Sequence, residues 1–206
     1  MKDVKKANLA IFVIILFLVA FAVFLWFYQR ERYSDIYFNY NGFDVHRVNF
    51  LEKGFVYKIS LISEIDKNLY SIESRFNPMD LEEIPVNANL DDIYDKEALF
   101  ITMDNNATGV SVLAATEISK VTGNDLIFRN PKVTHGALNA PIQDKNVTVV
   151  TCDNVNEYIG VISFEIGDKP RIYSENGCVI VVGKDENDLI RVADRLMLTL
   201  LGIMKP

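Results

Sequence analysis

The C-terminal segment "CVIVVGKDENDLIRVADRL", residues 178–196, joins a β-branched run directly to a run with helical spacing. In the expected last helix, one apolar stripe contains Leu189, Val192, Ala193, Leu196 and Leu200 and is widened by Met197, Leu198 and Leu201, whereas Glu186, Asp188 and Arg191 are expected to face outward. Earlier in the chain, the strand-like "ALFITM" is followed by the helical stripe of "NNATGVSVLAATEISKVTG". Further strands are expected at "DLIFRN" (125–130), "NVTVVTC" (146–152) and "VISFEI" (161–166), and "RIYSENGCVIVVG" predicts a hairpin that turns at Glu175-Asn176-Gly177. A strand followed by a helix that packs back on the sheet is typical of α/β domains. The sequence therefore predicts that residues 98–206 form an α/β domain, a Rossmann-like αβ sandwich, with an α+β fold as the alternative.

Residues 33–97 show shorter runs that alternate apolar and polar side chains. Asn41-Gly42 lies between two aromatic and β-branched stretches and predicts a hairpin, and residues 55–63 and 69–76 predict a second one. The segment from Asp80 to Glu97 carries seven carboxylates opposed only by Lys96. It lacks the loop pattern of an EF-hand, which favours a solvated connector over a calcium site. We expect a small antiparallel β region followed by an acidic connector.

An uncharged apolar run extends from Leu9 to Tyr28. Its length is close to the roughly 20 residues that a helix needs to cross a bilayer. Residues 1–32 are therefore predicted to form an N-terminal tail and a transmembrane anchor, with the lipid bilayer as partner. A cleaved signal peptide, with Ala20-Phe21-Ala22 at the cleavage site, is the alternative.

The basic residues that flank this run predict its orientation. Lys2, Lys5 and Lys6 precede it, whereas only Arg30 and Arg32 follow, which favours a cytoplasmic N-terminus and a single-pass protein with an extracytoplasmic outer domain. Two glycosylation sequons begin at Asn106 and Asn146. Asn146 opens an expected buried strand, so only Asn106 is expected to be an exposed acceptor.

Charge and motifs exclude several function classes. The formal net charge of −7 argues against nucleic-acid binding. Gly183-Lys184 stands where a phosphate-binding loop would, but the preceding glycine of a P-loop is missing and Asp185 brings a negative charge to that place. The dinucleotide-binding fingerprint is also missing. Asp185 is instead predicted to be a helix N-cap, and no cofactor is expected.

Cysteine and histidine are scarce, and their spacing predicts no metal site. Cys152-Asp153 after an expected strand, with His135 upstream, would suit a thiol nucleophile and base, although a packed structural cysteine is the simpler interpretation. If residues 146–152 and 178–182 are parallel neighbours, Cys152 and Cys178 lie at opposite strand ends, too far apart for a bridge. We therefore expect free thiols.

Three segments in order, "SVLAATEISKVTG", "NVTVVTCDNVNEY" and "RIYSENGCVIVVGKDENDLIRVADRL", resemble part of archaeal surface-layer proteins. Thr151-Cys152-Asp153 stands where that family has a Gly-Gly-Pro turn. The earlier "YNGFDV" and "YSIESRFNPMDLEEIPV" resemble uncharacterised single-helix archaeal membrane proteins. The resemblance implies a cell-surface or envelope setting and brings no known activity.

Two functions are compatible with these patterns. The first is a membrane-tethered envelope module without catalysis that binds envelope proteins, a glycan or another copy of itself. The alternative is a membrane-anchored extracytoplasmic enzyme, whose site at the carboxyl ends of parallel strands would use Asp104, Cys152, Asp153 and Lys184.

Overall fold

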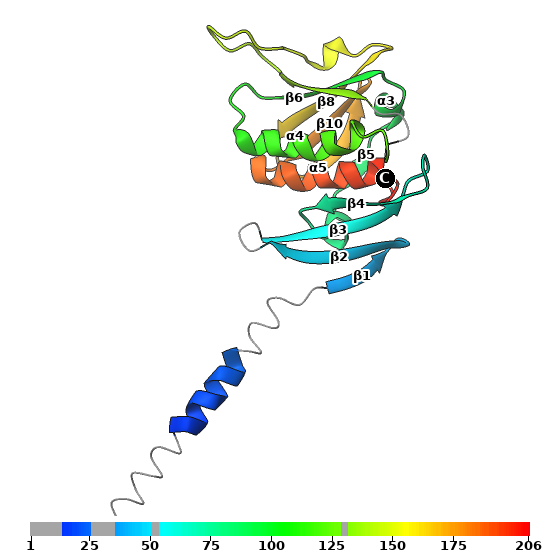
Figure 1. Ribbon diagram of the computed structural model, residues 1–206. Helices are drawn as coiled ribbons and strands as arrows, with labels where there is room; N and C mark the ends of the chain where they lie inside the picture. Colours follow the sequence, from blue (N-terminus) through cyan, green and yellow to red (C-terminus); the bar gives the residue numbers. More distant parts are fainter. Residues whose placement is uncertain (1–13, 26–35, 51–53, 129–131) are drawn as a thin grey trace, which may run out of the picture. The chain divides into compact units, whose positions relative to one another are not determined.

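The computed structural model describes residues 14–25, 36–50, 54–128 and 132–206 (Figure 1). The chain divides into two compact units, Met1–Ile36 and Tyr37–Pro206. In the first unit the described residues form one helix over 14–25. The second unit contains two β-sheets and the remaining helices, so the fold is mixed α/β with two sheets.

The predicted transmembrane anchor from Leu9 to Tyr28 is contradicted. Across the described residues, the structure contains no helix of sufficient length and apolar character to cross a bilayer. Both ends of the predicted span and its basic flanks lie outside the described residues. The single-pass membrane localisation with an extracytoplasmic outer domain was inferred from that span, and this prediction is contradicted together with it.

The first sheet is an antiparallel meander in the order β1-β2-β3-β4. Its strands are β1 (Ile36–Tyr40), β2 (Phe43–Phe50), β3 (Gly54–Ile62) and β4 (Leu69–Ser74). Asn41 and Gly42 connect β1 to β2 with φ angles of 51° and 91°, the left-handed conformations that a tight hairpin turn requires. Both hairpins predicted from the alternation of apolar residues are confirmed.

The second sheet is mixed and has the order β5-β9-β10-β8-β6-β7. It consists of β5 (Val86–Asn87), β6 (Ala98–Met103), β7 (Val133–Leu138), β8 (Ile159–Ile166), β9 (Arg171–Glu175) and β10 (Cys178–Gly183). The four strands β10, β8, β6 and β7 are parallel, whereas β9 runs antiparallel to β10. The predicted hairpin at Asn176-Gly177 forms the turn between β9 and β10.

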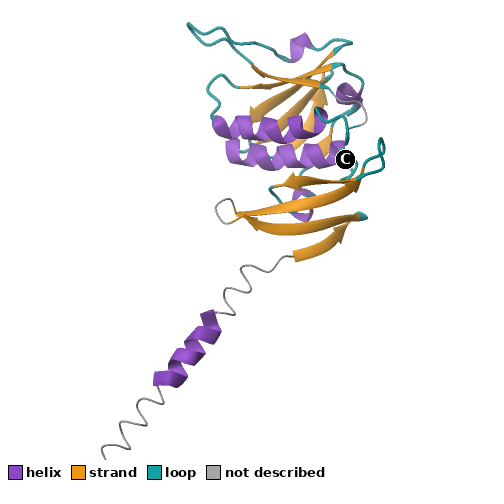
Figure 2. Cartoon of the chain, viewed as in Figure 1, coloured by secondary structure: helices purple, strands orange, loops and turns teal. Residues whose placement is uncertain are grey.

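Two long helices, α4 (Gly109–Thr122) and α5 (Glu186–Leu200), pack side by side on one face of this mixed sheet (Figure 2). Eleven of the residues of α5 are buried. The helix is buried to this extent because residues of the first sheet, such as Val45 and Ile59, share one hydrophobic core with α5 and with the mixed sheet. The wide apolar surface predicted for the last helix is explained by this position between two sheets.

The acidic connector folds around three short elements and is not purely solvated. Helices α2 (Pro78–Leu81) and α3 (Asp91–Tyr94) flank β5, and each buries one aliphatic side chain completely. Leu81 and Ile93 are the residues concerned, and Ile84 between them is also fully buried. Most of the carboxylates in the segment remain exposed. The connector is therefore amphipathic, with its charge outward and its apolar residues in the shared core.

Both faces of β10 are buried. Val179 and Val181 point into the main core beside the helices, whereas Cys178, Ile180 and Val182 belong to a second cluster on the opposite face. The second cluster includes Val150 and is flanked by Cys152 and Val155, from the segment that holds the 3₁₀ helix η1 (Cys152–Asn154). The face without long helices is thus closed by an irregular segment.

Two predicted strands are absent from the described residues. Residues 146–152 contribute only an isolated bridge between Val149 and Leu138, and Asn146 is exposed, contrary to the expected buried strand. The expected strand over 125–130 is a turn as far as residue 128, where the description stops until 132. Phe128 is buried there and stacks on Tyr94 at 5.7 Å, so its apolar character serves the core and not a strand.

Candidate functional site

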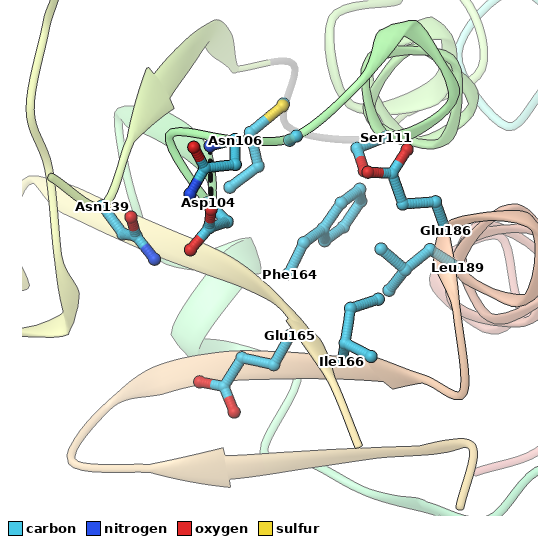
Figure 3. A pocket seen from close by; sticks show the side chains of 11 residues that line it. Asp104, Asn106, Ser111, Asn139, Phe164, Glu165, Ile166, Glu186 and Leu189 are labelled. Carbon is cyan, nitrogen blue, oxygen red and sulfur yellow. Dashed lines mark hydrogen bonds between the residues drawn. The ribbon is translucent and has the colours of Figure 1, made fainter. Parts of the chain in front are cut away.

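A cleft opens where the strand order of the mixed sheet reverses. From β6 the chain passes through α4 to β7 on one side, whereas from β8 it passes through β9 to β10 on the other side. In open α/β sheets, ligands bind outside the carboxyl ends of the strands at such a switch point. The cleft at this place has a volume of about 440 Å³ (Figure 3). It is lined by Met103, Asp104, Asn106, Ala107, Ser111, Asn139, Phe164, Glu165, Ile166, Glu186 and Leu189.

Asp104 and Asn139 come from the ends of adjacent parallel strands. Asp104 follows β6 directly, and its Oδ1 accepts a hydrogen bond from the backbone N–H of Asn106 at 2.8 Å. Asn139 follows β7, and its backbone N–H donates to the carbonyl of Met103 at 2.9 Å. This pairing continues the β6–β7 ladder by one residue, and both polar side chains lie on the same side of the cleft (Figure 3).

Glu186 connects the N-termini of the two long helices through hydrogen bonds. It is the first residue of α5, and its carboxylate accepts hydrogen bonds from the backbone N–H of Thr108, at 3.1 Å, and from the Thr108 hydroxyl. Thr108 is the N-cap of α4, where its own hydroxyl oxygen accepts from the N–H of Val110 at 3.2 Å. A carboxylate placed at two helix N-termini occupies the position that a bound phosphate would take.

The wall between Asp104 and Glu186 is apolar. Phe164, near the carboxyl end of β8, is only 4% exposed, and its ring lies between these two carboxylates in the view of Figure 3. Leu189 of α5 is buried beside it, whereas Ile166 at the end of β8 is 57% exposed. The cleft thus combines separated polar groups with an aromatic and aliphatic surface, a composition typical of small-molecule sites.

Negative charge dominates the cleft. Asp104, Glu165 and Glu186 line it, and no lysine or arginine is among the lining residues. The carboxylates do not converge on one point: within the described parts of the chain, no group of His, Cys, Asp and Glu side chains has the arrangement needed to hold a metal ion. Chemically, the arrangement can form ion pairs and hydrogen bonds at several separate points.

The structure does not bring the four candidate catalytic residues together. Asp104 lines the cleft. Lys184 lies at the same edge of the sheet, but it is exposed and is not one of the lining residues. Cys152 and Asp153 belong to η1, which is attached to the amino end of β10, the end opposite the cleft. An active site that uses all four residues is therefore not formed.

Cys152 and Cys178 form a disulfide with a Cα–Cα distance of 5.4 Å, so the prediction of free thiols was wrong. That prediction required residues 146–152 to be a strand parallel to β10. The neighbours of β10 are instead β8 and β9, and the chain at Val150 crosses the sheet face to reach the start of β10. His135, proposed as a base for the Cys152 thiol, stacks on Phe100 at 5.1 Å.

At the Gly183-Lys184 turn, carboxylates of the protein itself accept hydrogen bonds from backbone amides. Asp185 is the N-cap of α5, as predicted, and accepts from the N–H of Asp188 at 2.8 Å. In return, Asp188 accepts from the backbone N–H of Lys184 at 2.9 Å. These bonds use backbone amides that a phosphate-binding loop would offer to its ligand.

Sequence reasoning missed most of the cleft residues, including Ser111, Asn139 and Phe164. Phe164 falls within the predicted strand "VISFEI". Ligands bind at the carboxyl ends of parallel strands in such sheets, but this rule points to Phe164 only when the strand order is already known. Asn139 was missed because no strand was predicted over Val133–Leu138, the range of β7; strands were expected over 125–130 and 146–152 instead. Glu186 was expected to face outward, whereas its carboxylate is held by Thr108.

Comparison of the chain with family models, with curated proteins and with solved structures finds no match. The resemblance to archaeal surface-layer proteins therefore stays a prediction.

Proposed function

We propose that this chain is a recognition module that binds a small polar molecule without covalent chemistry. The observation that carries the proposal is the cleft at the switch point between β6 and β8, which is lined by residues from three strand ends and two helix N-termini. Its volume of about 440 Å³ falls within the range of small-ligand sites.

Binding is favoured over catalysis by the identity of the lining residues. A covalent mechanism needs a nucleophile beside a base, and a third group that orients the base. Ser111 is the only hydroxyl among the lining residues, and no histidine, lysine or cysteine lines the cleft with it. Among the four residues considered for the enzyme alternative, only Asp104 lines the cleft.

The rigidity of the polar groups also supports recognition. The Asp104 carboxylate is held by its bond to the Asn106 amide, and the backbone of Asn139 is held by the bond that extends the sheet. Groups that are held in place before a ligand arrives lose little conformational entropy when it binds. The cleft therefore has the preformed geometry of a binding site.

A thermal-shift screen with neutral, cationic and anionic small molecules tests this proposal. A ligand at about 100 times its Kd stabilises the native state by about 2.7 kcal/mol, which raises Tm by several degrees for a chain of this size. We expect Asn139→Trp, which places a bulky ring in the cleft, to abolish the shift. Asn146→Trp makes the same change at an exposed position that does not line the cleft, and should leave the shift intact. A screen in which no compound gives an Asn139→Trp-sensitive shift contradicts the proposed function.

A further inference from the structure

We propose that the ligand of this cleft is an organic cation, of the aliphatic diamine or polyamine class. This inference rests on the proposed function, because it names the chemical class that the same site recognises. Three features of the cleft support it: its charge, the placement of two carboxylates on opposite sides of an aromatic ring, and a serine hydroxyl that forms no hydrogen bond within the described residues.

The negative charge of the cleft disfavours anionic ligands and favours cationic ones. Asp104, Glu165 and Glu186 line it and no basic side chain does. A cleft lined by one sign of charge concentrates ligands of the opposite sign and repels those of the same sign. The helix N-termini at this edge do not reverse this preference, because Glu186 accepts from the N–H of Thr108 at the start of α4.

The spacing of the carboxylates favours an extended organic cation over a metal ion. In the described portion of the chain, no acidic cluster is arranged to hold a metal. Figure 3 shows Asp104 and Glu186 on opposite sides of the Phe164 ring, whereas the Glu165 side chain points away from that ring. A ligand with ammonium groups separated by methylenes can meet Asp104 and Glu186 while its chain crosses the apolar wall between them.

Ser111 provides an observation independent of the acidic residues. It lies in the first turn of α4 and lines the cleft, yet the residue is only 2% exposed. Its hydroxyl forms no hydrogen bond with any residue that the structure describes, and its oxygen is not one of the fully buried polar atoms, so it can still reach a ligand. Its small remaining exposure faces the cleft, where an ammonium N–H can donate to the Ser111 oxygen.

Isothermal titration calorimetry of the full chain with 1,4-diaminobutane tests the ligand class, and 1,4-butanediol serves as the neutral isostere. We expect the diamine to bind, the diol to give no binding heat, and the affinity for the diamine to fall as salt is added. Asp104→Asn should weaken diamine binding by about tenfold or more, because it removes one charge and keeps the side-chain shape. The amide oxygen of the variant can still accept from Asn106, so the local turn is retained.

Asp153→Asn is the matched control, because it makes the same change in an exposed residue at the opposite end of the sheet. It should bind the diamine like the wild-type protein. Ser111→Ala should weaken binding by about threefold or more through loss of one acceptor. An unchanged affinity in Ser111→Ala would overturn the role assigned to the hydroxyl.

Two outcomes separate this inference from the proposed function. If the diamine fails to bind, or binds Asp104→Asn as well as it binds the wild type, the organic-cation assignment is overturned. If a neutral or anionic compound in the same screen still gives a shift that Asn139→Trp abolishes, the cleft remains a binding site and only its ligand class was wrong.

Discussion

The hydroxyl of Ser74, at the end of β4, donates a 2.8 Å hydrogen bond to Oδ2 of Asp194 in the buried α5 helix. The same oxygen accepts from the backbone N–H groups of Arg75, at 2.6 Å, and Phe76, at 3.2 Å. Asp194 is completely buried, and its Oδ1 has no hydrogen-bond partner among the described residues. A single carboxylate thus connects the antiparallel sheet to the helix layer.

The first prediction concerns the pH dependence of stability. Burial raises the pKa of Asp194 from 3.8 to about 7, and the negative charge of Glu117 adds to this effect, whereas the bonds from Ser74, Arg75 and Phe76 oppose it. Between about pH 4 and pH 7 the native state therefore holds a proton that the unfolded chain has lost. The contribution of Asp194 to stability is highest below this window and decreases as the pH rises through it, by at most about 1.4 kcal/mol per pH unit.

Asp194→Asn isolates this contribution, because an amide can accept at the Oδ2 position without titrating. Chemical denaturation of both proteins from pH 4 to pH 8 should show the wild type losing stability relative to the variant as the pH rises. Asp168→Asn, at an exposed carboxyl group, should follow the wild-type curve. Parallel curves for the wild type and Asp194→Asn would contradict the raised pKa.

The second prediction concerns the disulfide. Cys152 and Cys178 close a loop with a sequence separation of 26 residues, and a loop of that length is stabilised by about 3 kcal/mol in the chain-entropy treatment. Alkylation of the denatured, oxidised protein followed by mass spectrometry should label neither cysteine before reduction and both after it. The Cys152→Ala, Cys178→Ala double variant should unfold at lower denaturant concentration. Labelling of both cysteines without reduction would restore the free-thiol interpretation.

The third prediction concerns the glycine of the Gly183-Lys184 turn. A Cβ atom at Gly183 would lie 2.7 Å from the backbone N of Leu189 and 3.0 Å from the carbonyl oxygen of Asp185. Because these are backbone atoms of the first turn of α5, they cannot move aside without displacing the helix. Gly183→Ala should cost about 1–3 kcal/mol in the free energy of unfolding. Gly109→Ala is the control, since a Cβ there meets no atom within 4 Å.

The fourth prediction separates the cap from the neighbouring lysine. Asp185→Ala removes the acceptor for the Asp188 amide and should cost about 1 kcal/mol in a urea titration. Lys184→Ala removes an exposed side chain and should change stability by less than about 0.5 kcal/mol. If Lys184→Ala proves the more destabilising change, the turn has a role that its hydrogen bonds do not explain.

Local patterns in the sequence were sufficient for the elements whose signals lie within a few residues. The strand Ala98–Met103, the helix Gly109–Thr122 and the cap at Asp185 were all predicted, because periodicity and capping depend on neighbours in the chain. The hairpin turns at Asn41-Gly42 and Asn176-Gly177 were predicted for the same reason, since each needs left-handed backbone conformations within one turn.

Local patterns led to a wrong or missing element in three places. The apolar run from Leu9 to Tyr28 has the composition of a membrane span, yet the described residues include no helix with the length and apolar character that crossing a bilayer requires. Ile127 and Phe128 look like strand residues but plug the core at a turn. The true edge strand, β7, exposes half of its residues and so lacks the apolar alternation that would reveal it.

The sequence by itself determined which segments bury one face and where tight turns occur, because those properties are written in the spacing of neighbouring side chains. Only the tertiary structure decided that β8 lies between β6 and β10, since strand order depends on pairing between residues far apart in the chain. That order places Asp104 and Phe164 in one cleft. The packing of segments that are distant in the chain also brings Cys152 to Cys178 and buries Asp194 beside Ser74. Each of these contacts joins segments that have no local pattern in common, which is why none of them could be predicted from periodicity.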